Sequence, residues 1–119
     1  MNGLLNKVDK PGVVDCSCLI KGKDILVSSF SKELKSYETV GKQAFLYVFQ
    51  SAVKNHSRHN EAHLHIGEMR LSGFKLKPGL ILVCLSKKDA NIMKVRHNMH
   101  EFYRLFLQSK VKKALKADS

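Results

Sequence analysis

Residues 79 to 92 read Gly-Leu-Ile-Leu-Val-Cys-Leu-Ser-Lys-Lys-Asp-Ala-Asn-Ile, and this stretch sets a buried strand directly before a helix. The run from Leu80 to Leu85 is continuously apolar, which is typical of a central strand covered on both faces. Asp89 favours a helix N-cap, because its carboxylate can accept hydrogen bonds from free backbone N–H groups. We therefore predict a helix that starts at Asp89. Its core-facing residues follow helical spacing: Ile92, Val95, Met99, Phe102, Tyr103 and Phe106.

Four further strands are predicted upstream. Val13–Ile20 and Ile25–Phe30 are apolar runs separated by a short Gly-containing turn, which indicates an antiparallel hairpin. Residues 61–69 and 70–77 alternate between apolar and polar side chains, as half-buried strands do. Gly73 interrupts the second of these and predicts a bulge.

Two more helices complete the pattern. A short one is predicted within residues 1–10, ended by Pro11-Gly12, and a long one from Tyr37 to about His56, capped by Ser36. The long helix has two apolar stripes, the first formed by Val40, Ala44, Val48 and Ala52 and the second by Phe45, Phe49 and Val53. Two further residues, Leu46 and Tyr47, widen the apolar arc. One sheet face covers only part of such an arc, so this helix is expected to need a second surface.

The predicted order is helix, two strands, helix, three strands, helix. The fold class is therefore α/β of the α+β kind: a five-stranded, mostly antiparallel sheet with helices on both faces. Residues 1–108 are expected to form one domain, and residues 109–119 a basic extension.

Composition narrows the class of protein. With 119 residues and 44% apolar side chains, the chain is expected to fold as one globular unit without a metal or cofactor. Cys16, Cys18 and Cys84 lie in apolar runs and are expected to be buried, reduced thiols, the first two on the same strand face. No signal peptide or membrane span is evident, so we expect a cytoplasmic protein.

Histidines form the only cluster with site-like spacing: His56, His59, His63 and His65. No nearby cysteine or carboxylate pair completes a zinc set, and we expect a solvated loop and the outer face of an edge strand. His97 and His100 stand three residues apart and lack the spacing of a helical metal pair. No metal site is predicted.

Catalytic motifs are missing as well. The sequence has no phosphate-binding Gly-x-x-x-x-Gly-Lys-Ser/Thr loop, no Gly-x-Ser-x-Gly elbow and no paired carboxylates. We do not expect an enzyme.

Basic residues dominate the charge. Lys and Arg number 21 against 10 Asp and Glu, a net charge of +11. Clustering is confined to one turn and the C-terminal extension: Lys87 and Lys88; Lys110, Lys112, Lys113 and Lys116. Such clusters attract acidic proteins, anionic membranes or nucleic acids. Arginine is scarce and the aromatics belong to core stripes, so nucleic acid is the least favoured of these partners.

At three places the sequence resembles a Roadblock/dynein light-chain domain. A short helix closes with Pro11-Gly12-Val13; the hairpin Cys18–Ser29 holds a Gly/Asp turn and ends in small residues; and Gly79–Ile92 carries an Asp-Ala-Asn start to the last helix. The basic extension and the aromatic second helix depart from the family pattern.

The resemblance implies a homodimer, or a heterodimer with a paralogue. In the family the third strands pair edge to edge, and the second helices pack across the two-fold axis. The expected interface residues are Phe45, Leu46, Phe49, Val53, His63 and His65. Protonation of the two histidines would then place like charges together, which predicts a weaker dimer at acidic pH.

The family also implies a function. Its members act as scaffolds or regulators of Ras-like small GTPases, or as adaptors on motor and membrane-associated complexes. Two alternatives stay open: an electrostatic binder of nucleic acid or anionic membrane, and a profilin-like or longin-type sandwich with a different element order.

Overall fold

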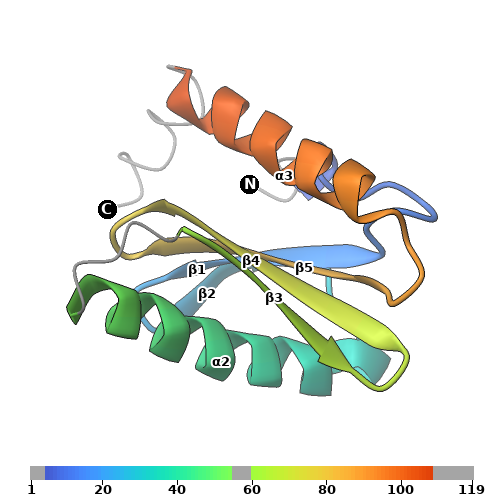
Figure 1. Cartoon of the computed structure of the whole chain (residues 1–119), viewed down its shortest axis with the longest axis horizontal. Coiled ribbons are helices and arrows are strands. Elements are labelled where there is room, and N and C mark those ends of the chain that lie inside the picture. The colour runs from blue at the N-terminus through green and yellow to red at the C-terminus, as the bar shows by residue number, and fades with distance from the viewer. Residues whose placement is uncertain (1–4, 55–59, 109–119) are drawn as a thin grey trace.

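The computed structural model describes residues 5–54 and 60–108, except for the side chain of Val53. Within them, five strands form one sheet in the order β2-β1-β5-β4-β3 (Figure 1). Every neighbouring pair is antiparallel. The strand bounds are β1 Cys16–Lys21, β2 Asp24–Ser28, β3 Glu61–Ile66, β4 Met69–Lys77 and β5 Leu80–Lys87. The five-stranded antiparallel prediction is confirmed.

The apolar run that follows Gly79 forms the centre of the sheet. All residues of β5 from Leu80 to Ser86 are buried, with β1 on one side and β4 on the other. Side chains alternate between the two faces of a strand, so both faces of β5 need cover. Helix α2 (Lys35–Lys54) covers one face and α3 (Ile92–Leu107) covers the other, which gives the three layers visible in Figure 1.

Two apolar cores result, one under each helix. The α2 core holds Phe45, Phe49, Leu71, Ile81 and Val83 together with Cys16 and Cys18, which share one strand face as predicted. The α3 core contains Leu19, Phe74, Leu82, Cys84, Val95, Met99, Phe102 and Phe106.

The N-terminal segment belongs to the α3 side. Residues 1–4, where the predicted short helix begins, lie outside the described residues, and Leu5 opens a helical turn in which Val8 and Asp9 donate backbone hydrogen bonds to its carbonyl. Leu5 and Val8 are buried in the α3 core. The carboxylate of Asp9 accepts hydrogen bonds from Ser17 and Ser29, which fixes this segment to the first hairpin.

The long helix begins earlier than predicted. A 3-10 helix, η1 (Lys32–Leu34), leads directly into α2 at Lys35, so Ser36 lies inside the helix and is not its cap. Glu38 stands in the first turn of α2, where its negative charge suits the helix dipole, and its carboxylate accepts hydrogen bonds from Ser28 and Lys35.

Two other local predictions are wrong. Gly73 lies in regular register opposite Val83, and the irregularity of β4 falls between Lys75 and Lys77. The cap of α3 is Asn91, whose side chain accepts hydrogen bonds from the backbone N–H groups of Met93 and Lys94. Asp89 lies in the turn before it.

Candidate interaction surface

One side of α2 exposes apolar side chains to solvent. Val40, Tyr47 and Val48 are 41%, 72% and 38% exposed, and Ala44 is partly buried. These four residues stand at positions i, i+4, i+7 and i+8, so they form one continuous strip, which we call the α2 stripe. An exposed apolar strip on a helix marks a contact surface more often than an isolated apolar residue does.

The two phenylalanines expected at an interface are instead core residues. Phe45 and Phe49 are 1% and 3% exposed, and their rings stack at a centroid distance of 6.2 Å beneath α2. Phe45 and Phe49 therefore need no second surface, and the apolar side chains of the helix that lack cover are those of the α2 stripe. Leu46 is half-buried on another side of the helix, and the side chain of Val53 lies outside the description.

The sheet edge beside the stripe has no neighbour in the described chain. Strand β3 pairs only with β4, and its Ala62, Leu64 and Ile66 are partly buried on the α2 side. Leu46 and Gln50 of α2 point toward the β1–β2 turn, where they line a groove with Gly22 and Lys23. The α2 stripe, on the opposite flank of the helix, therefore faces the β3 side.

The other face of β3 carries a charged cluster centred on Glu61. Its carboxylate accepts hydrogen bonds from His63 Nε2 at 2.7 Å, Arg96 Nε at 2.7 Å and His100 Nε2 at 3.1 Å. Burial acts to raise the pKa of Glu61, but these three hydrogen bonds outweigh it and hold the pKa below its ordinary value of 4.5. The cluster joins the edge strand to α3.

The predicted edge histidines lie on this charged face. His63 Nδ1 lies 2.8 Å from Ser72 Oγ, and His65 Nε2 accepts a hydrogen bond from Arg70 Nε at 3.3 Å. His56 and His59 fall outside the described residues. Within residues 5–54 and 60–108, no group of three His, Cys, Asp or Glu side chains has the arrangement of a metal site.

The cysteines are unsuited to nucleophilic chemistry. All three thiols are free and buried, as the strand pattern predicted. Burial, with smaller effects from Asp9, Asp15 and Glu38, raises the pKa of Cys16 from 9.0 to about 12. Burial also raises the pKa values of Cys18 and Cys84. A thiol needs a depressed pKa to react as a thiolate, so these groups are packing residues.

The described basic turn is electrostatically mixed. Lys87 and Lys88 are exposed, but they share a surface depression with Glu68 and Asp89. Lys110, Lys112, Lys113 and Lys116 lie outside the described residues. Of the six lysines predicted to form the basic docking site, only Lys87 and Lys88 can thus be located, and together with Glu68 and Asp89 they do not form a patch of one sign.

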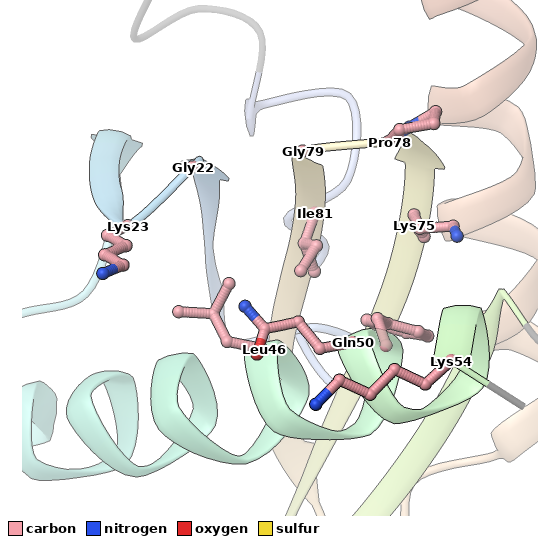
Figure 2. Close-up of a pocket in the computed structure, with 10 residues that line it drawn as sticks. Gly22, Lys23, Leu46, Gln50, Lys54, Lys75, Pro78, Gly79 and Ile81 are labelled. Carbon is pink, nitrogen blue, oxygen red and sulfur yellow. The ribbon is translucent and has the colours of Figure 1, made fainter.

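A groove that the sequence analysis missed lies between α2 and one end of the sheet. It encloses about 500 Å³. Figure 2 shows α2 running across the strands, with the β1–β2 and β4–β5 turns at the far rim. Its lining residues are Gly22, Lys23, Leu46, Phe49, Gln50, Lys54, Lys75, Pro78, Gly79 and Ile81. They come from α2, from strands β4 and β5 and from the β1–β2 and β4–β5 turns, so no local motif in the sequence indicates them.

No protein-family model matches the sequence, and the comparison with curated proteins finds no match. Solved structures, in contrast, share its fold. A Roadblock/LC7 domain from Streptomyces avermitilis has a TM-score of 0.73 at 8% identity, over 89% of this chain and 93% of that one. MglB from Myxococcus xanthus has a TM-score of 0.72 at 11% identity, over 98% and 94%. MglC from Myxococcus xanthus has a TM-score of 0.58 at 15% identity, over 86% and 92%. The chain therefore has the Roadblock/LC7 fold, as the sequence resemblance predicted.

Proposed function

We propose that this protein is a non-catalytic binding module that dimerises through the α2 stripe and strand β3. The observation that carries the proposal is the α2 stripe, in which Val40, Tyr47 and Val48 are exposed, beside the edge strand β3, whose outer side has no neighbour among the described residues. Natural proteins rarely leave a sheet edge and an adjoining apolar strip both uncovered. A two-fold axis beside β3 would cover both with the same elements of a second copy.

This arrangement keeps the interface predicted from the family resemblance but changes the residues that carry it. Leu64 and Ile66 lie on the α2 face of β3, so they would extend the apolar contact made by Tyr47 and Val48. His63 and His65 would lie at the edge of the paired strands, on the α3 face.

The partner class follows from the same resemblance. Roadblock-type dimers serve Ras-like small GTPases or larger motor and membrane-associated assemblies, and we propose one of these as the partner. Two facts are compatible with a role that needs no bound cofactor: the cysteines are buried and inert, and the sequence lacks nucleotide-binding and hydrolase motifs. Within the described residues, no helix is long and apolar enough to cross a membrane.

Self-association tests the dimer directly. Sedimentation equilibrium should give the wild type a mass of twice 13.5 kDa, and Tyr47→Asp should yield the monomer mass at the same concentration. Met93→Asp is the matched control, because Met93 is similarly exposed, at 64%, but lies on α3. A monomeric wild type, or a Tyr47→Asp variant that stays dimeric, would contradict the proposal.

A pull-down tests the partner class. Purified wild-type dimer should retain nucleotide-binding proteins from a cell extract. Tyr47→Asp should retain fewer of them, because a partner that binds a surface formed by both subunits does not bind the monomer. Equal recovery by both proteins would count against a partner that recognises the assembled dimer.

The net charge of +11 favours one other candidate, an electrostatic binder of nucleic acid or anionic membrane. A salt titration separates the two functions, because binding through phosphate contacts weakens steeply as salt rises. Absence of nucleic-acid and vesicle binding at physiological salt would remove this candidate.

A further inference from the structure

The groove between α2 and the sheet end combines an apolar floor with a basic rim. Leu46, Phe49, Ile81 and Pro78 supply the apolar surface. Lys23 stands on the first hairpin turn, Lys75 on β4 and Lys54 on the last turn of α2, as Figure 2 shows. Apolar walls with a few polar groups are the usual composition of a binding site.

The charge around this groove has one sign. No aspartate or glutamate of the described residues lines it, and none of the three lysines forms an ion pair with a carboxylate in that part of the chain. Asp24, the neighbour of Lys23, is exposed and does not contribute to the lining. Three ammonium groups around one apolar hollow repel each other and favour an anionic occupant.

None of the three segments outside the described residues has the acidic sequence of such an occupant, and residues 1–4 have no acidic side chain. Residues 109–119 carry four lysines and one aspartate, and residues 55–59 read Asn-His-Ser-Arg-His, so both segments have the wrong sign of charge. The α2 stripe lies on the opposite flank of the helix, which leaves the groove open in the proposed dimer.

We propose that this groove docks a short acidic segment of a partner protein. One or two large apolar side chains of that segment would contact Leu46, Phe49 and Ile81, while its carboxylates would pair with Lys23, Lys54 and Lys75. The inference rests on the proposed partner-binding function, to which it adds a second surface and the chemistry of the ligand.

A selection from a random-peptide phage library on immobilised full-length protein tests the proposal. The expected consensus combines aspartate or glutamate with leucine, isoleucine or an aromatic residue. A synthetic peptide of that consensus should bind the wild type, and Lys54→Glu/Lys75→Glu should bind it at least tenfold more weakly. Leu46→Ser should also weaken binding, and this loss should persist in high salt, which screens charge but not apolar contact.

The high net charge makes a matched control essential. Lys10→Glu/Lys94→Glu changes the net charge by the same amount at exposed positions outside the groove lining, and should bind like the wild type. Equal losses in the two double variants, a consensus without acidic residues or a selection without enrichment would overturn the proposal. Wild-type binding to anionic phosphatidylglycerol vesicles that Leu46→Ser abolishes, without peptide enrichment, would assign the groove to a membrane and overturn it too.

Sedimentation of the same variants separates the two proposals. Dimeric Lys54→Glu/Lys75→Glu protein that has lost peptide binding would support both. Wild-type protein that is dimeric but binds no peptide would reject the proposed groove ligand and leave the proposed dimer standing.

Discussion

Residue 73 is a glycine, and the absence of a side chain there leaves room for Phe45, the central aromatic residue of the α2 core. A Cβ built on Gly73 would lie 2.7 Å from Cγ and Cδ1 of Phe45, closer than real contacts allow. Alanine in a strand interior ordinarily gains about 0.5–1 kcal/mol over glycine in backbone entropy. Overpacking a core costs about 1–3 kcal/mol, so the clash should dominate and Gly73→Ala should destabilise the protein. Urea unfolding followed by circular dichroism measures the change.

The double variant Gly73→Ala/Phe45→Leu supplies the control. If the clash is the cause, the smaller side chain removes part of it, and the two losses are less than additive. Additive losses would show that Gly73 matters for another reason. The sequence could not predict this pairing, because Phe45 and Gly73 are 28 positions apart and a strand glycine equally indicates a bulge.

At the level of elements, the start of α3 depends on a contact from another strand. Asp89 and Asn91 both favour an N-cap, so local sequence does not choose between them. Arg70 of β4 does: its guanidinium donates to the carbonyl oxygens of Lys88 at 2.7 Å and Ala90 at 3.1 Å. Carbonyls bound in this way are held outside the helix, which then begins at Ile92.

Cap substitutions should separate the two candidates. Asn91→Ala removes the acceptor for Met93 and Lys94 and should lower the free energy of unfolding by about 1 kcal/mol. Asp89→Ala should change it by less than about 0.5 kcal/mol, as an exposed turn substitution does. Thermal and urea unfolding of both variants measure this; a larger loss for Asp89→Ala would contradict the assignment.

Across the whole molecule, the layers could be predicted from the sequence, but the side-chain contacts that connect them could not. Hydrophobic period alone distinguishes the fully apolar β5, the alternating β3 and the helical α2 and α3, and together they define the three layers. The assignment of Phe45 and Phe49 to an interface failed for one reason. The spacing of apolar residues shows that a helix has two apolar sides, but it does not show which side packs on the sheet. The Glu61 cluster was invisible for a different reason: its partners Arg96 and His100 stand 35 and 39 positions away.

The Glu61 cluster, which joins β3 to α3, should determine how the free energy of unfolding changes at acidic pH. The folded-state pKa of Glu61 lies below its ordinary value of 4.5, so its contribution to stability is complete above that value and is lost as pH falls below it.

Glu61→Gln should therefore be less stable than the wild type at pH 7, by about 1 kcal/mol given the partly exposed partners. The variant should also lose less further stability between pH 5 and pH 3. Glu101→Gln is the matched control, because among the described residues Glu101 pairs with Arg104 alone, within α3, and its side chain is 41% exposed. Its unfolding free energy should follow the wild-type pH profile in urea titrations at one fixed protein concentration, which keeps any dimer equilibrium constant. Coincident profiles for Glu61→Gln and Glu101→Gln would mean that the cluster on β3 contributes no more than an ordinary surface pair.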